Sequence, residues 1–371
     1  MCPEPAVRGP ARARLEIDLD AVAHNWRLLA ARARPAACAA VVKADAYGLG
    51  LAPVARTLRQ AGCRTFFVAR LEEGARLRAH LPDAEILVLD GVGRGEEAEL
   101  KAHRLVPVLN QPGELALWRR YAAARGRRLP AALHLDTGMT RLGFTPAEFA
   151  AVEEEDLAGL EPVLVMSHLA CADEPDHPLN AAQRARFAAA SRRFAGRVRR
   201  SLAASSGIFL GPDYRFELVR PGVALYGVNP VPGRPNPVRP VVRLVAPVLR
   251  VFTLDAPATV GYGATFEAPA GARIATVPVG YADGLPRAAS GRGRARIAGI
   301  EVPFAGRVSM DLLGLDVSAL PEGTVAPGCE VEIVYGPEGV DRLAAAAGTI
   351  GYEILTRLGR RFVRHYRGGA A

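Results

Sequence analysis

Two kinds of hydrophobic pattern divide the chain near residue 230. Between residues 38 and 227, short continuous apolar runs alternate with longer stretches in which apolar residues recur at helical spacing. The apolar runs span residues 38–44, 65–70, 85–90, 105–110, 131–136, 162–170, 200–205 and 216–227. Residues 51–62 and 112–126 are examples of the amphipathic stretches, and both end in glycine. Continuous apolar strands joined by helices predict a parallel sheet that is covered on both faces.

The number of these strand and helix units favours an α/β fold built as a (β/α)8 barrel over an open doubly wound sheet, which is the alternative. A Pro- and Gly-rich stretch at 229–240 then predicts a linker. Beyond it, strand-like segments predict a smaller, all-β C-terminal domain, closed by a helix near 339–358; they span residues 241–254, 273–280, 295–317 and 329–336. The expected domains are therefore 12–240 and 241–371, with residues 12–20 as a strand shared with the β domain.

Composition adds little to this picture. The chain has 371 residues, of which 50% are hydrophobic and 23% charged, as is usual for a globular protein. Its net charge of +9 comes almost entirely from arginine, because Lys43 and Lys101 are the only lysines. The arginines are spread along the sequence and form no stripe, so they indicate a composition bias and not a nucleic-acid partner.

Cysteine usage and the N-terminal sequence predict a cytoplasmic protein. The five cysteines show no CxxC spacing and fit reduced thiols better than a disulfide framework; they are Cys2, Cys38, Cys63, Cys171 and Cys329. The first 18 residues contain no apolar core of a signal peptide, and no run of 18 apolar residues follows, so no membrane partner is expected.

Two residues at the ends of predicted barrel strands are candidates for chemistry. Lys43 closes the first apolar run, where desolvation would lower its pKa and suit an amine that acts as a nucleophile or base. The alternative is a lysine that simply reaches solvent. His168 also ends a strand, and it could equally be a structural histidine of the barrel rim. A zinc site is a further alternative, although its spacing matches no familiar motif; it would use His168, Cys171, Asp173 and His177.

The sequence around Lys43 resembles the pyridoxal-phosphate lysine signature of the alanine racemase family, a fold-type III group with a barrel and a β domain. Further similar motifs follow in order over almost the whole chain. They are VVKADAYGLG at 41–50, DTGMTRLGF at 136–144, SHLACAD at 167–173, AASSGI at 203–208, VRPGVALYG at 219–227, VGYGATF at 260–266, PVGYADGLPR at 278–287, GRVSMD at 306–311 and GYEILTRLGRR at 351–361.

The resemblance implies a set of residues that bind pyridoxal 5′-phosphate. Lys43 would bind the cofactor covalently and also act as a base. Its phosphate would be held by hydroxyl and backbone donors from several segments; these belong to Tyr47, Ser205, Gly222, Val223 and Tyr352. Arg220 would face the pyridine nitrogen, with His168 behind it. Because arginine does not give up its proton, that nitrogen would stay unprotonated, which favours racemisation over side reactions.

One implied feature of the substrate site differs from the family pattern. Arg141 would contact the cofactor and the substrate carboxylate. Many family members steady this arginine with a lysine modified by carbon dioxide, seven residues earlier. Here that position is His134, so an anion or His134 itself must take over the support.

The β domain would complete the site across a homodimer interface. The resemblance implies Tyr262 as the second catalytic base, Met310 as a backbone donor to the substrate carboxylate, Asp311 in support and Tyr281 at the site entrance. No metal is expected. The implied activity is the interconversion of L- and D-alanine by two bases, supplying D-alanine for peptidoglycan.

Three other activities are alternatives. A broad-specificity amino-acid racemase would share these motifs. A fold-type III decarboxylase would be expected to place an acidic residue at the pyridine nitrogen, where this chain has Arg220. A pyridoxal-phosphate carrier would resemble the barrel alone, and the segments after residue 240 argue against it.

Overall fold

The computed structural model describes residues 12–369, and the chain divides into two compact units. The barrel unit comprises residues 22–225, 229–238 and 369. The β unit comprises residues 12–21, 226–228 and 239–368. The second unit is therefore assembled from segments that lie far apart in the sequence.

All eight predicted apolar runs of the barrel unit form parallel strands. They are β2 (Ala37–Cys38) with β3 (Ala40–Val41), β4 (Thr65–Val68), β5 (Glu85–Val88), β6 (Val106–Leu109), β7 (Leu129–His134), β8 (Leu160–Met166), β9 (Arg199–Ser201) and β10 (Leu218–Val219). β3 to β9 pair in sequence order. β10 pairs in parallel with β2, and the Arg220 N–H donates to Ala203 O at 2.9 Å beside β9. The strands thus close into a ring, which confirms the barrel and excludes the doubly wound alternative.

Helices follow the strands of the barrel unit where the sequence shows amphipathic stretches. They are α3 (Leu51–Ala61), α4 (Leu71–His80), α5 (Glu97–Ala102), α6 (Pro112–Ala123), α7 (Pro146–Ala150) and α8 (Pro178–Ala190). α1 (Leu19–Ala33) begins in the β unit and precedes the first barrel strand, and α2 (Lys43–Tyr47) is not a right-handed helix, because residues 44–46 have φ between 53° and 55°. α3 buries Leu51, Val54, Ala55 and Leu58, an i, i+3, i+4, i+7 stripe that faces the barrel. The helices predicted at 51–62 and 112–126 are confirmed by α3 and α6.

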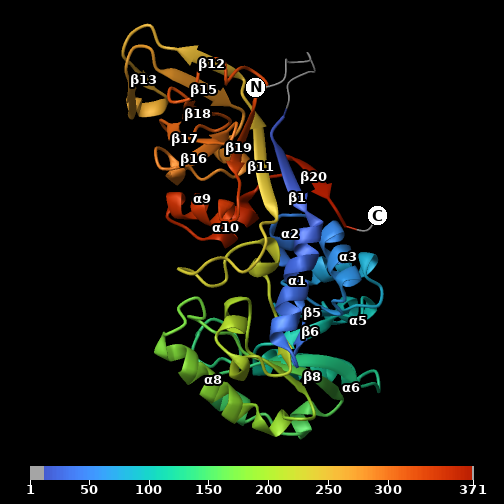
Figure 1. Cartoon of the computed structure of the whole chain (residues 1–371). Helices are drawn as coiled ribbons and strands as arrows, with labels where there is room; N and C mark the ends of the chain where they lie inside the picture. The colour runs from blue at the N-terminus through green and yellow to red at the C-terminus, as the bar shows by residue number, and fades with distance from the viewer. Residues whose placement is uncertain (1–11, 370–371) are drawn as a thin grey trace. The chain divides into compact units, whose positions relative to one another are not determined.

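A nine-stranded sheet organises the β unit. Its strands are β1 (Arg14–Asp18), β11 (Val242–Pro247), β12 (Arg250–Thr253), β15 (Arg273–Val277), β16 (Arg294–Ile297), β17 (Ile300–Ala305), β18 (Leu313–Asp316), β19 (Glu330–Val334) and β20 (Val363–Arg367). Their order is β12-β15-β18-β17-β16-β19-β11-β1-β20. Figure 1 shows β1 between β11 and β20. β1 pairs with β11 in antiparallel and with β20 in parallel orientation. A separate hairpin joins β13 (Ala258–Val260) to β14 (Phe266–Ala268).

The single helix predicted at 339–358 is wrong. Two helices replace it, α9 (Gly339–Ala347) and α10 (Gly351–Arg357). Gly348 adopts a left-handed φ of 66°, and the Thr349 N–H bonds back to Ala344 O at 3.0 Å. Gly348 ends α9, because a residue in the left-handed region cannot continue a right-handed helix. The hydrogen bond from Thr349 then satisfies a carbonyl of the last turn of α9.

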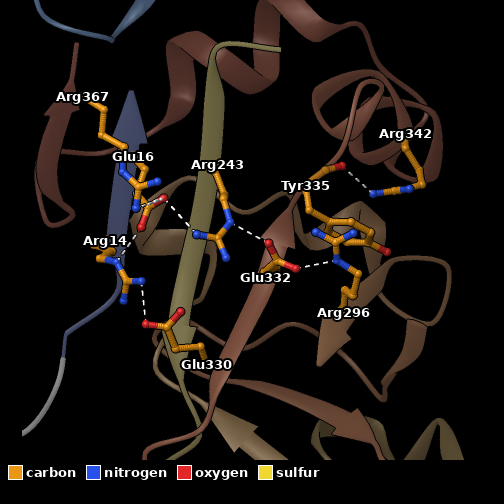
Figure 2. A network of polar contacts seen from close by, with 9 residues as sticks. All are labelled: Arg14, Glu16, Arg243, Arg296, Glu330, Glu332, Tyr335, Arg342 and Arg367. Atoms are coloured by element: carbon orange, nitrogen blue, oxygen red, sulfur yellow. Dashed lines mark hydrogen bonds and ion pairs between the residues drawn. The ribbon is translucent and has the colours of Figure 1, made fainter. Parts of the chain in front are cut away.

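A chain of alternating charges crosses five strands of the β unit (Figure 2). Glu16 on β1 is contacted by Arg14 at 2.9 Å, Arg243 at 2.9 Å and Arg367 at 3.0 Å. The Glu16 side chain is only 5% exposed. Arg243 on β11 also contacts Glu332 on β19 at 2.5 Å, and Glu332 contacts Arg296 on β16. These contacts place opposite charges on neighbouring strands, an arrangement that stabilises their pairing.

Three further observations concern the whole described chain. Residues 229–240 contain no helix or strand. Within 12–369, no helix is both long enough and apolar enough to cross a bilayer. Cys38, Cys63 and Cys171 are free thiols, and Cys2 lies outside the described residues.

Candidate functional site

The site residues predicted in the barrel unit lie at or beyond the C-terminal ends of its strands. Lys43 follows β3, His134 ends β7 and His168 follows β8. Ser205 follows β9, and Arg220 follows β10. The C-terminal ends of parallel barrel strands meet at one face, where the loops form an open mouth. The barrel topology therefore brings these residues together.

Lys43 begins a turn of unusual handedness. The next four residues, 44–47, have φ between 53° and 56°, although none of them is glycine. A left-handed conformation costs about 1–2 kcal/mol for each such residue. Strain of this kind persists only where the surroundings impose it, and it concentrates at functional sites. The turn carries Lys43 at one end and Tyr47 at the other.

The surroundings of Lys43 favour its neutral amine. Burial, followed by the positive charge of Arg141, lowers the pKa of Lys43 below its ordinary value. The carboxylates of Asp90 and Glu73 oppose this effect but do not cancel it. A neutral amine is the form that attacks a carbonyl carbon and accepts a proton.

Arg220 is a buried cation surrounded by neutral acceptors. It is 3% exposed and donates to Ser201 Oγ at 2.5 Å and to Ser167 O at 2.7 Å. Burial lowers the pKa of Arg220 to about 9, so it remains charged at neutral pH. Within residues 12–369, no Asp or Glu carboxylate pairs with Arg220, Lys43 or Arg141 by ion contact. The buried guanidinium of Arg220 is therefore satisfied by neutral hydrogen-bond acceptors.

His168 supports Arg220 in one tautomeric form. Its Nδ1 lies 3.3 Å from an Arg220 guanidinium nitrogen. Arginine can only donate, so Nδ1 must accept and the ring proton sits on Nε2. Desolvation, and then the charges of Arg220 and Arg141, lower the pKa of His168 to about 3, which keeps the ring neutral. The structure thus brings His168 and Arg220 into contact.

His134 is held in the opposite tautomer by Asn110, a residue that the sequence analysis missed. The Asn110 amide nitrogen donates to Val108 O at 2.8 Å and to Leu89 O at 3.1 Å. Asn110 Oδ1 therefore faces His134 Nδ1, 2.8 Å away, and Nδ1 must carry the proton. Burial, followed by the charge of Arg220, lowers the pKa of His134 to about 4. Nε2 is thus an acceptor, and no hydrogen bond occupies it among residues 12–369.

The loop that carries Arg141 is built around one carboxylate. Asp136 Oδ1 accepts from the N–H groups of Gly138 and Met139 at 2.9 Å, and from Thr140 at 3.2 Å. Burial raises the pKa of Asp136, but these backbone donors outweigh it and leave the pKa below its ordinary value. Since Asp136 stays ionised, it fixes the loop and leaves Arg141 exposed at its end.

Polar groups gather where the resemblance places the phosphate. The buried Ser205 Oγ accepts from the Gly222 N–H at 3.0 Å and the Ala224 N–H at 3.2 Å. A side chain on Gly222 would collide with the Tyr47 hydroxyl, so this approach requires glycine. Val223 begins the 3-10 turn Val223–Tyr226 and is buried. Ser205 Oγ accepts both of these bonds and keeps its own proton to donate, which fits a phosphate-bearing cofactor.

The site residues predicted in the β unit lie on four of its segments. Tyr262 lies between β13 and β14 and is 70% exposed. The Tyr281 N–H donates to Ser309 O, and the Ala282 N–H donates to Met310 O, both at 3.0 Å, so the Tyr281 and Met310 loops lie together. Met310 is 53% exposed. Tyr352 is an exposed residue in the first turn of α10.

Arg361 joins the Tyr281 and Met310 loops and is a second residue that the sequence analysis missed. It contacts Asp283 at 3.1 Å and Asp311 at 2.7 Å. Asp283 is buried, and its other oxygen accepts from the Gly280 N–H at 2.9 Å. Arg361 therefore links Asp311, predicted as a supporting residue, to Asp283 on the loop that carries Tyr281.

The alternative of a zinc site has no support in the described structure. Among residues 12–369, no three His, Cys, Asp or Glu side chains are grouped so that they could hold a metal ion. His177 instead caps α8, where its Nδ1 accepts from the Leu179 N–H at 3.2 Å.

Comparisons with known proteins identify the family. Residues 17–230 match the alanine racemase N-terminal domain, and residues 241–366 match its C-terminal domain. The chain is 55% identical to an alanine racemase of Rhodospirillum rubrum, with 96% of each chain covered. It is 48% identical to a catabolic alanine racemase of Agrobacterium fabrum, covering 96% of this chain and 93% of that one.

A solved structure gives the same result. The Bartonella henselae alanine racemase, with covalently bound pyridoxal phosphate, has a TM-score of 0.92 and 37% sequence identity. The match covers 96% of this chain and all of that one. The two domain matches and the full-length relatives show that this chain belongs to the alanine racemase family of pyridoxal-phosphate-dependent isomerases.

Proposed function

We propose that the protein interconverts L- and D-alanine with pyridoxal phosphate as its cofactor. The observation that carries the proposal is the barrel mouth, where burial lowers the pKa of Lys43 and where, among residues 12–369, no carboxylate forms an ion pair with the buried Arg220. An acidic residue at the position of Arg220 would suit a decarboxylase. Family membership also supports a cytoplasmic enzyme that supplies D-alanine for peptidoglycan.

Each candidate residue has a role that its surroundings support. When bound, pyridoxal phosphate supplies a ring that stabilises negative charge at the substrate Cα. Lys43 would hold the cofactor and move a proton on one face of that carbon. Arg220 would present N–H groups to the ring nitrogen, with His168 fixing the guanidinium. Tyr47, Ser205, Gly222 and Val223 would hold the phosphate, with Tyr352 assigned to it on the resemblance alone, and Arg141 would pair with the substrate carboxylate.

The direct test is an assay with separated enantiomers. Purified protein loaded with pyridoxal phosphate is incubated with a panel of single L-amino acids, and both enantiomers are quantified. We expect L-alanine to reach an equal mixture with D-alanine faster than any other amino acid. Serine, lysine or arginine reacting as fast as alanine would indicate a broad-specificity racemase, and release of carbon dioxide would indicate a decarboxylase.

A second part of the proposal is a homodimer whose sites use both chains. Tyr262 is a large aromatic side chain that is mostly exposed, as Met310 is. We propose that Tyr262 of a second copy moves the proton on the face of Cα opposite Lys43. Met310 of that copy would offer its backbone N–H to the carboxylate, with Tyr281 at the entrance. A two-fold dimer of this kind holds two equivalent sites.

Mixing two inactive variants tests the shared site. Lys43→Ala and Tyr262→Ala should each be nearly inactive, because each lacks one base in both sites. After subunit exchange, about half of the dimers are hybrids, and each hybrid has one complete site of two. We therefore expect about a quarter of the wild-type rate. If mass spectrometry shows exchanged chains and no activity returns, both bases belong to one chain.

Because His134 stands where many family members have a modified lysine, we expect the rate of racemisation not to depend on carbon dioxide. The chain has no lysine at this position, and the neutral His134 Nε2 offers an acceptor in its place. Removing carbon dioxide from the buffer and then adding bicarbonate should therefore leave the rate unchanged. His134→Leu, which removes the acceptor, should raise KM for alanine by about tenfold if Nε2 steadies Arg141. A rate that rises with bicarbonate in the wild-type enzyme would contradict this view of His134.

A further inference from the structure

The strained turn after Lys43 is held from outside by one carboxylate. Glu73 lies in the first turn of α4, and its Oε1 accepts from the Ala44 N–H at 2.5 Å. Ala44 is the residue after Lys43 and the first of the four left-handed residues. This contact therefore fixes the peptide group that joins Lys43 to the turn.

The second oxygen of Glu73 anchors the carboxylate itself. Glu73 Oε2 accepts from the Ala69 N–H at 2.9 Å and from the Arg70 N–H at 3.3 Å. Ala69 directly follows β4, the strand that pairs with β3. One side chain thus ties the backbone after β3 to the backbone after β4, at the barrel face that carries the site.

A second contact from α4 supports the same turn. Asp45 Oδ1 accepts from the Leu51 N–H at 2.9 Å, and it lies 3.5 Å from the Arg76 guanidinium. Arg76 is exposed and its nitrogen lies 3.5 Å from the carboxylate, so this contact is weaker than the charge-assisted hydrogen bond of 2.5 Å from the Ala44 N–H to Glu73. Glu73 bonds directly to the backbone of the turn, at the Ala44 N–H.

We propose that Glu73 is a positioning residue, whose carboxylate holds the left-handed turn 44–47 so that Lys43 and Tyr47 are preorganised for the cofactor. This inference rests on the proposed function, in which Lys43 binds pyridoxal phosphate and Tyr47 its phosphate. In this role Glu73 acts through its hydrogen bond with the Ala44 N–H.

The test compares Glu73→Ala and Glu73→Gln with Glu72→Ala. Glu72 is the exposed neighbour on α4, and no hydrogen bond or ion pair involves it among residues 12–369, so it is a matched control. Two quantities are measured: hydrogen exchange of the backbone amides of the unloaded protein, and its affinity for pyridoxal phosphate from the absorbance of the lysine-bound cofactor.

In Glu73→Ala we expect the Ala44 amide to exchange about tenfold faster and the cofactor to bind about tenfold more weakly. Glu73→Gln keeps one carbonyl acceptor and should fall between Glu73→Ala and the wild type. Glu72→Ala should match the wild type in both measurements.

Two outcomes would overturn the inference. One is faster exchange at residues 69 and 70 alone, with Ala44 and the cofactor affinity unchanged, since Glu73 would then only cap α4. The other is an unchanged Glu73→Gln together with a Glu73→Ala that fails to fold. Failure of the proposed function gives a different result, because the wild-type protein itself would then not bind pyridoxal phosphate.

Discussion

Lys43→Ala is expected to lower the rate of racemisation more than about a thousandfold, because one side chain both binds the cofactor and moves a proton. The chain provides a matched control in Lys101, its only other lysine, which lies exposed on α5. Lys101→Ala should retain the wild-type rate. Together the two variants separate the role of one amine from the effect of losing a lysine.

Chemical trapping gives the same prediction a readout that is independent of rate. Borohydride reduction of the loaded protein should fix the pyridoxyl group on the peptide that contains Lys43, and Lys43→Ala should yield no labelled peptide. A label on Lys101, or a wild-type protein that binds no pyridoxal phosphate, would contradict the assignment of Lys43.

Glu16→Gln is expected to lower the free energy of unfolding of the β unit by about 2 kcal/mol. Glu16 is buried and contacts three arginines, so losing its charge leaves three cations close together without their shared anion. The expected loss in unfolding free energy is smaller than for breaking a fully buried ion pair, because the three arginines are partly exposed to water. Denaturant unfolding of Glu16→Gln and of the control Glu322→Gln, an exposed residue, measures the difference.

The same variant should also change the response to acid. Burial alone would raise the pKa of Glu16, but hydrogen bonds from Arg14 and Arg243 leave it below its ordinary value near 4.5. The stabilisation is therefore complete above pH 4.5 and is lost as the pH falls through the folded-state pKa. The gap between wild type and Glu16→Gln should close at low pH. A gap that persists there would show that shape, and not charge, stabilises this position.

The sequence predicts the strands of the barrel well because buried parallel strands consist of nearly continuous apolar residues. The break between α9 and α10 was missed because apolar spacing continues through Gly348, while the helix ends on a backbone conformation. Helical periodicity reports which face is buried and says little about where a helix stops.

Residues that support other site residues are harder to predict from the sequence than the residues at the mouth of the barrel. Glu73 and Asn110 serve the site through hydrogen bonds to segments 29 and 24 residues away, and such pairs leave no local pattern. One feature of the sequence does point to Asn110: it is a polar residue at the end of an apolar run (105–110), and Lys43 lies at the corresponding end of the run 38–44. Arg361 lies within a motif of the family but joins two loops about 50 and 80 residues earlier, which only the folded β unit reveals.

The position of β1 has a consequence for the order of folding. β1 is synthesised before the barrel unit. Its partners in the sheet, β11 and β20, are synthesised only after the barrel strands, and β20 is the last strand of the described chain. The barrel unit is thus an insertion between the first strand of the β sheet and the rest. During synthesis, β1 must wait unpaired while more than two hundred residues emerge, and its sheet closes only when β20 leaves the ribosome. Deleting residues 12–18 would therefore split the finished sheet between β11 and β20 rather than trim its edge.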